Sequence, residues 1–139
     1  MKKIIILTGD PNSINSEIIY KTWKTLSKKV RKNIYFISNY KLIKKQFDNL
    51  GYKTKIEIVK NIDKLSKNSN IKIINIDLIF NNPFKVKKNQ ASNFILDSLN
   101  LGHKLALDKK KTLGLINCPI NKELLKNKFV GVTEYFANK

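Results

Sequence analysis

Short apolar runs alternate along this chain with longer segments in which apolar residues recur at helical spacing. A short apolar run bounded by turn residues is typical of a buried strand, whereas recurrence every three to four residues is typical of an amphipathic helix. The runs predict strands at residues 3–7, 34–37, 54–59, 71–79 and 113–117. The helical spacing predicts helices at residues 16–30, 39–50, 89–108 and 122–126.

This alternation indicates an α/β protein with a mostly parallel sheet, because neighbouring parallel strands need a long crossover connection, usually a helix. The chain contains no internal repeat and no low-complexity linker, which favours one domain over residues 1–139. A turn at residues 131–134 leads into a last apolar segment at 135–137, so the chain stops part way through an expected helix.

The charge of the chain raises nucleic-acid binding as one hypothesis. The 139 residues include 28 Lys+Arg and 10 Asp+Glu, a formal net charge of +18. Only Arg31 is an arginine, the residue best suited to forked contacts with phosphate and guanine. The 27 lysines are spread along the chain beside 20 Ile and 18 Asn, which indicates biased amino-acid usage. A basic nucleic-acid-binding module stays an alternative, but we do not expect a nucleic-acid partner.

Composition excludes several other classes of protein. A hydrophobic fraction of 42% argues against a disordered polyelectrolyte, and a single cysteine excludes a disulfide scaffold. No apolar run reaches the ~18 residues that a membrane helix needs. The hydrophobic stretch at residues 4–7 is too short for the core of a signal peptide. We expect a cytoplasmic protein without a membrane partner.

Candidate functional residues lie on segments that follow strands, because ligands of open parallel sheets bind at the carboxyl ends of the strands. The segments are 8–17, 117–123 and 131–134. Asp10 in the first either satisfies backbone donors at a helix start or helps to bind an anion. Lys122 in the second is a cation at a helix amino terminus, where it either meets an anionic ligand or is one more surface lysine of a lysine-rich chain.

Three further residues are ambiguous or unpromising. Thr133 is either a helix cap or a ligand contact, and composition does not choose between them. Cys118 is expected to be a small core residue, because a nucleophile needs an activating base and the only histidine, His103, lies in the middle of a helix. His103 is expected to be exposed, and one histidine without a second ligand nearby makes a poor metal site.

The same three segments, in this order, resemble motifs of the 4-hydroxythreonine-4-phosphate dehydrogenases of vitamin B6 biosynthesis. Residues 9–17, Gly-Asp-Pro-Asn-Ser-Ile-Asn-Ser-Glu, are similar to that family's Gly-Asp-Pro-Ala-Gly-Ile-Gly-Pro-Glu. Residues 118–123, Cys-Pro-Ile-Asn-Lys-Glu, are similar to Ala-Pro-Ile-Asn-Lys-Glu. Residues 131–135, Gly-Val-Thr-Glu-Tyr, are similar to Gly-His-Thr-Glu-Phe or Gly-His-Thr-Glu-Tyr.

The resemblance implies a fold related to the isocitrate and isopropylmalate dehydrogenases, with two α/β/α domains and a homodimer. It implies NAD-dependent oxidation and decarboxylation of 4-phosphooxy-L-threonine to 3-amino-2-oxopropyl phosphate, in the synthesis of pyridoxal 5'-phosphate. A divalent metal, Zn, Mg or Co, would stabilise the alkoxide and then the enolate.

Because the chains of this family are about twice as long or more, the resemblance identifies residues 1–139 as an amino-terminal portion. The family's metal-binding histidines and its nicotinamide contacts lie beyond the matched part, so we assign no metal ligand, cofactor contact or catalytic residue to this chain. We expect the 139-residue chain alone to be inactive.

The resemblance carries a substrate contact over to Thr133, and with less support to Lys122 and Asp10. Val132 stands where the family has a substrate-contacting histidine, and valine can neither donate a hydrogen bond nor carry charge. In the first motif the family's glycines and proline are replaced within residues 12–16, which predicts a differently shaped loop. These departures leave open a divergent relative that acts on another phosphorylated hydroxy acid.

Overall fold

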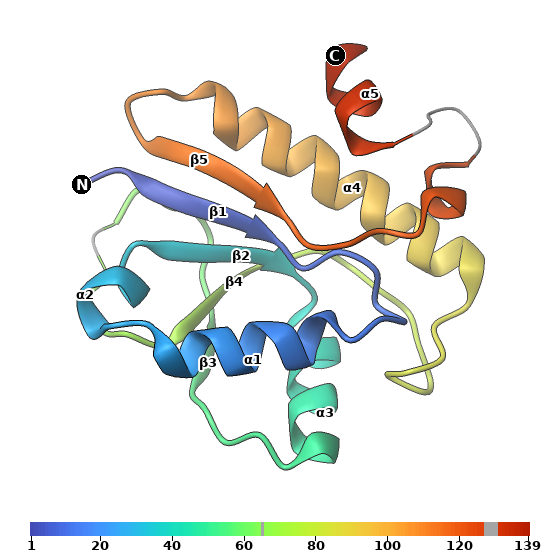
Figure 1. Cartoon of the computed structure of the whole chain (residues 1–139), viewed down its shortest axis with the longest axis horizontal. Helices are drawn as coiled ribbons and strands as arrows, with labels where there is room; N and C mark the ends of the chain where they lie inside the picture. The colour runs from blue at the N-terminus through green and yellow to red at the C-terminus, as the bar shows by residue number, and fades with distance from the viewer. Residues whose placement is uncertain (65, 127–130) are drawn as a thin grey trace.

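The computed structural model describes residues 1–64, 66–126 and 131–139. Its sheet has five strands in the order β3-β4-β2-β1-β5, and all four neighbouring pairs are parallel (Figure 1). The mostly parallel α/β sheet predicted from the sequence is therefore confirmed. The strands are β1 (Lys3–Leu7), β2 (Ile34–Ser38), β3 (Ile56–Ile58), β4 (Ile71–Asn75) and β5 (Thr112–Asn117).

Helices cover both faces of the sheet, as the expected α/β/α layers require. Helix α4 packs on one face, and α1 and α3 pack on the other (Figure 1). The helices are α1 (Asn15–Thr25), α2 (Lys28–Arg31), α3 (Tyr40–Leu50), α4 (Lys88–Leu107) and α5 (Val132–Ala137), with a 3-10 helix η1 (Lys122–Leu125).

The sheet divides the hydrophobic core into two clusters, because successive side chains of a strand point to opposite faces. On the α4 side, Ile5 and Ile37 pack with Phe94 of the helix. On the other side, Phe36 of β2 and Trp23 of α1 are both almost completely buried. Burial of each such side chain contributes about 1.5–3 kcal/mol to folding.

Register brings the ends of three strands to one edge of the sheet. Leu7, the last residue of β1, pairs with Ile37 of β2 on one side and with Asn117 of β5 on the other. Because the strands are parallel, the segments that follow β1, β2 and β5 leave the sheet together. Two of the three candidate segments therefore start side by side.

The predicted helix over residues 16–30 is wrong in one respect, because it is interrupted. Leu26 is extended, with φ −78° and ψ 141°, and closes α1. Ser27 then begins a separate four-residue helix, α2, by accepting a hydrogen bond from the Val30 N–H at 3.3 Å. Ser27 is itself extended, with φ −66° and ψ 153°. A serine in extended backbone caps a new helix more readily than it continues an old one.

The predicted strand over residues 71–79 is too long. β4 ends at Asn75, and the next N–H, that of Ile76, donates to the Ser38 carbonyl at 2.7 Å. The Ile76 carbonyl accepts from Asn39 Nδ2 at 2.8 Å, so this part of the chain bonds to the turn after β2. The strand predicted at 54–59 is also shorter, since only Ile56–Ile58 pair with β4.

Strand β5 lies at one edge of the sheet and is covered unevenly. Helix α4 packs on one of its faces, while Leu113 and Ile116 stay 68% and 53% exposed. A hollow of about 210 Å³ lies between α1 and β5, with an almost wholly apolar lining that includes Ile18, Trp23 and Ile116. Across the described ranges, no helix is long and apolar enough to cross a membrane.

Candidate functional site

The first two motif segments touch directly, although more than 100 residues separate them. The Asp10 N–H donates to the Pro119 carbonyl at 3.2 Å, and Asn15 Nδ2 donates to the same oxygen at 2.8 Å. Gly9 makes this approach possible. Its φ is +74°, and a Cβ there would lie 2.6 Å from the Pro119 carbonyl oxygen. Only glycine adopts this backbone conformation readily and leaves room for a second backbone.

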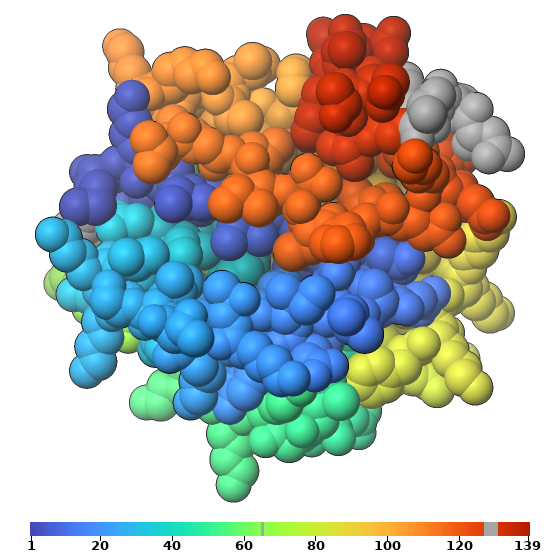
Figure 2. All heavy atoms as spheres, in the orientation of Figure 1, coloured from blue at the N-terminus to red at the C-terminus, as the bar shows by residue number. Residues whose placement is uncertain are grey.

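Residues 81–88, which belong to none of the three motif segments, complete the wall of the site beside the first two motif segments. Asn12 holds this stretch by two hydrogen bonds, in which Nδ2 donates to the Val86 carbonyl at 2.8 Å and Oδ1 accepts from the Val86 N–H at 2.7 Å. Buried Gln46 of α3 donates to the Pro11 and Pro83 carbonyls at 2.9 and 2.8 Å. Figure 2 shows the first two motif segments and residues 81–88 against one another, in blue, orange and yellow.

These segments line an open cavity of about 300 Å³. Lys88 Nζ and Glu123 Oε2 form an exposed ion pair across it at 3.3 Å. With Asp10 and Glu123 ionised and Lys88 protonated, its walls carry a formal charge of −1, which suits an ammonium group better than a phosphate. The residues that line it are Asp10, Asn12, Val86, Lys88, Asn121, Glu123 and Leu124.

The stretch of the first motif that departs from the family pattern has a structural use. Asn12 and Asn15 stand in that stretch, and their side chains form the bonds to Val86 and Pro119 described above. Asn15 is 3% exposed, and its Oδ1 accepts no hydrogen bond from the part of the chain that the structure describes. A buried acceptor without a donor costs free energy, so Asn15 does not satisfy all of its polar atoms within this chain.

Lys122 lies beside the cavity and does not line it. It is the exposed first residue of η1, whose N-cap is Asn121. The Asn121 Oδ1 accepts from the Glu123 N–H at 3.1 Å and so caps η1. The predicted candidate Asp10 does line the cavity, where its Oδ1 accepts from the Asn12 N–H at 2.8 Å. Helix α1 begins after Ile14, whose side chain makes no capping hydrogen bond.

The third motif segment packs elsewhere. Tyr135 Oη hydrogen-bonds to Asn100 Oδ1 of α4, and the Phe136 ring stacks on His103 at 5.7 Å between centroids. Val132 is half-buried against the core, and Thr133 is exposed on the first turn of α5. Thr133 is not among the residues that line the cavity beside Asp10.

His103 and Cys118 have structural environments. The expectation that His103 is an exposed helix residue is wrong, because the Phe136 ring covers it partly. Cys118 is half-buried against the core cluster on the α1 side, which fits the predicted core role. Burial raises the pKa of the Cys118 thiol above its ordinary value, so the thiol is protonated at neutral pH and weakly nucleophilic.

The described residues do not fit a metal centre. No group of three or more His, Cys, Asp or Glu side chains within residues 1–64, 66–126 and 131–139 is placed to hold a metal ion. The carboxylates of Asp10 and Glu123 in the cavity have no third ligand of these types with them.

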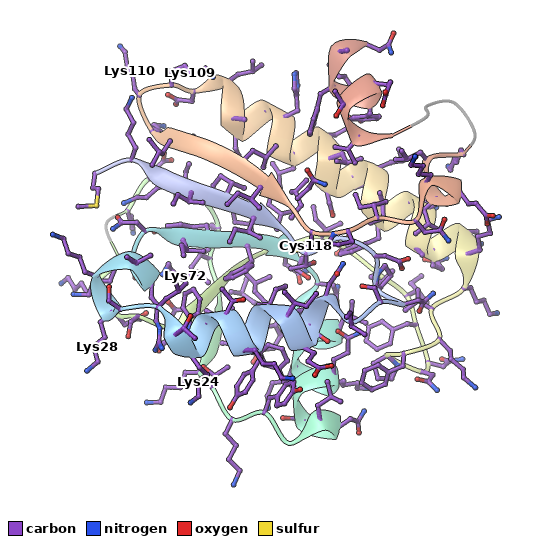
Figure 3. The ribbon with its side chains drawn as sticks, viewed as in Figure 1. Lys24, Lys28, Lys72, Lys109, Lys110 and Cys118 are labelled. Atoms are coloured by element: carbon purple, nitrogen blue, oxygen red, sulfur yellow. The ribbon has the colours of Figure 1, made fainter. Side chains whose placement is uncertain are left out.

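Lysines project from several parts of the surface. Figure 3 shows Lys24 and Lys28 on and after α1, and Lys109 and Lys110 at the turn between α4 and β5, at separate corners of the molecule. These lysines thus belong to different parts of the fold. Nucleic-acid binding stays an untested alternative.

Comparisons with known proteins identify the fold. No protein-family model and no curated protein sequence matches the chain. The chain is similar to the crystal structure of a 4-hydroxythreonine-4-phosphate dehydrogenase from Burkholderia phymatum, with a TM-score of 0.84 and 22% identity over 99% of this chain and 43% of that one. For the enzyme from Klebsiella pneumoniae the TM-score is 0.77, with 18% identity over 99% of this chain and 45% of that one.

At sequence identities of 22% and 18%, this structural similarity shows that the folds are alike. The chain has the fold of one portion of these dehydrogenases and spans less than half of their length. The resemblance predicted from the three motifs is confirmed at this level.

Proposed function

We propose that this chain is the amino-terminal portion of a dehydrogenase that oxidises 4-phosphooxy-L-threonine with NAD. The observation that supports this most strongly is the contact between the first two motif segments through Gly9 and Pro119, in a fold that matches such dehydrogenases. Either motif alone is short. Two motifs that resemble one family and share a hydrogen-bonded interface support a common site more strongly than either motif does alone.

In this proposal the cavity beside Asp10 and Glu123 receives the amino group of the substrate, because its walls carry net negative charge. Lys122 stands at the rim, where an ammonium attracts the phosphate or carboxylate of the same molecule. Thr133 is a hydroxyl donor on the separate helix α5. Cofactor, metal and the partner protomer of a homodimer belong to the proposed whole enzyme.

Binding of 4-phosphooxy-L-threonine to the 139-residue chain tests this assignment. Isothermal titration is expected to show binding that weakens about tenfold in Asp10→Asn, since a hydrogen bond to a charged group contributes about 1.5–3 kcal/mol. Thr25→Ala is the control, because Thr25 is exposed at the end of α1 and its hydroxyl bonds only to the Thr22 carbonyl. Equal affinity of Asp10→Asn and the unmodified chain would contradict the site.

The same chain is expected not to reduce NAD with this substrate, because the resemblance places the metal-binding histidines outside the matched part. Absorbance of NADH measures this directly. Turnover by the 139-residue chain would show that it carries catalytic groups of its own and would overturn the assignment as a portion.

One observation favours a second candidate, a divergent relative that acts on another phosphorylated hydroxy acid. Val132 is apolar and half-buried where the family has histidine, so its side chain offers the substrate no polar contact. The two candidates are distinguished by the same titration with other phosphorylated hydroxy acids. Tighter binding of one of these than of 4-phosphooxy-L-threonine favours the divergent relative.

A further inference from the structure

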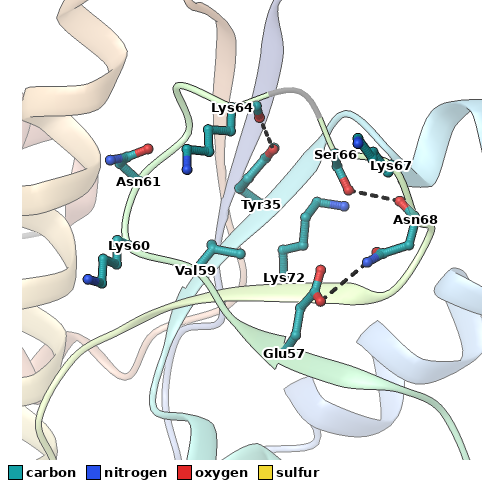
Figure 4. Close-up of a pocket in the computed structure, with 10 residues that line it drawn as sticks. All are labelled: Tyr35, Glu57, Val59, Lys60, Asn61, Lys64, Ser66, Lys67, Asn68 and Lys72. Carbon is teal, nitrogen blue, oxygen red and sulfur yellow. Dashed lines mark hydrogen bonds between the residues drawn. The ribbon is translucent and has the colours of Figure 1, made fainter.

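A second cavity lies near the amino ends of the strands, away from the cavity beside Asp10. It has a volume of about 390 Å³, within the usual range for small-molecule sites. Tyr35 and Lys72, the second residues of β2 and β4, form its floor, and residues 59–61, 64 and 66–68 of the segment after β3 form its rim (Figure 4). Tyr35 Oη donates to the Lys64 carbonyl at 3.1 Å and ties that segment to the sheet.

Lys72 is the unusual residue of this cavity, because it is a lysine that is only 1% exposed. Its Nζ donates to the Arg31 carbonyl at 3.1 Å and to the Asn70 carbonyl at 3.3 Å, and lies 5.1 Å from the centre of the Tyr35 ring. An ammonium group has three donors, so these bonds leave one. Among the described residues, no carboxylate lies within ion-pair distance of it.

A buried cation without an anion beside it is costly, since charges in protein interiors are normally paired. Burial lowers the pKa of Lys72 from 10.5 to about 8, and Lys3 adds to this, while the carboxylate of Glu57 opposes it. Glu57 is held at a distance by Asn68, whose Nδ2 donates to Glu57 Oε2 at 3.3 Å. The protein therefore places a cation in this cavity without neutralising it.

The other charges of the lining have the same sign. Lys60, Lys64 and Lys67 line the cavity with Lys72, and Glu57 is the only acidic residue of the lining. Four lysines and one glutamate sum to a formal charge of +3 when all are ionised. Ser66 and Asn68 add neutral hydrogen-bonding groups at the rim. Ammonium groups and amide donors are the groups that bind phosphate, whose two negative charges this lining can balance.

We propose that this cavity is a binding site for a phosphate-bearing small molecule, with Lys72 as its buried anchor and Lys60, Lys64 and Lys67 at its mouth. The site lies at the opposite edge of the sheet from the cavity beside Asp10. It is independent of the proposed dehydrogenase function, since it uses none of the motif residues.

Titration of the whole chain with inorganic phosphate tests the site, at constant ionic strength maintained with NaCl. Amide chemical shifts of residues around Tyr35, Glu57 and Lys72 are expected to move and saturate. Lys72→Met retains the apolar stem and removes the charge, so its affinity for phosphate is expected to fall at least about tenfold. Lys109→Met, on an exposed turn of another element, is the control and is expected to bind like the unmodified chain.

Two results would overturn the proposal. One is the absence of saturable binding by the unmodified chain, and the other is equal phosphate affinity of Lys72→Met and Lys109→Met, which would indicate a general charge effect. If Lys72→Met does not fold, the rim variant Lys64→Gln with Lys67→Gln takes its place and is expected to weaken binding several-fold.

Parallel titrations identify the ligand class. Tighter binding of glycerol 3-phosphate than of inorganic phosphate identifies an organic phosphate, and equal affinity identifies the inorganic ion. Tighter binding of citrate than of either would contradict a phosphate site.

Discussion

Gly9 is the residue on which the contact between the two motif segments depends. Gly9→Ala places a Cβ at 2.6 Å from both the Pro119 carbonyl oxygen and Asn15 Nδ2, on a backbone with φ +74°. We expect a loss of about 3 kcal/mol in the free energy of unfolding, because the left-handed conformation costs about 1–2 kcal/mol and a backbone atom must also shift. Urea unfolding followed by circular dichroism measures it.

Gly51 provides the matched control. Its φ is +70°, but nothing lies within 4 Å of a Cβ built there. Gly51→Ala therefore carries the conformational cost alone, about 1–2 kcal/mol. Equal losses in the two variants would show that the close approach at Pro119 contributes nothing.

At the scale of elements, α3 shows how a cap also joins two parts of the fold. Asn39 Oδ1 accepts from the Leu42 N–H at 2.9 Å and caps the helix, while Nδ2 donates to the Ile76 carbonyl at 2.8 Å. Asn39→Ala removes both bonds at a site that is 5% exposed, so we expect a loss of about 2 kcal/mol in thermal or urea unfolding.

The cap of α2 is the comparison for this prediction. Ser27 is exposed, caps a helix of only four residues, and accepts one hydrogen bond at 3.3 Å. Ser27→Ala is expected to cost about 0.5 kcal/mol. A larger loss in Ser27→Ala than in Asn39→Ala would contradict the view that the bond to Ile76 gives the Asn39 cap its importance.

At the scale of the whole molecule, the net charge of +18 opposes folding by self-repulsion. Raising NaCl from about 10 mM to about 150 mM shortens the Debye length from about 30 Å to about 8 Å. We therefore expect the free energy of unfolding to rise with salt, as measured by urea titration at each concentration. A fall would indicate that the ion pairs contribute more than the repulsion.

A charge-reduced variant isolates this effect. Lys109→Glu with Lys110→Glu changes two exposed residues of the turn before β5 and lowers the formal charge by four, from +18 to +14. Its unfolding free energy is expected to depend less on salt than that of the unmodified chain. The same slope in both proteins would place the origin of the salt effect elsewhere.

The order of strands and helices and the positions of the motif segments followed from the sequence, because apolar spacing and turn residues act over a few neighbours. The break at Leu26 and the end of β4 at Asn75 did not follow. Apolar residues continue past both points, and the chain leaves the element because Ser27 and the turn after β2 offer other hydrogen-bond partners.

Tertiary structure alone decided two features. One is the part of the wall of the Asp10 cavity that residues 81–88 form, and the other is the cavity around Lys72. Residues 81–88 join the site through Asn12 and Gln46, at sequence separations of 74 and 37 residues, which no local pattern reveals. Lys72 is one of 27 lysines in the sequence, and only folding buries it. Sequence thus determined which elements and motifs form, since these depend on near neighbours. Tertiary structure decided which polar groups meet and which charge is left unpaired, since these depend on contacts between distant segments.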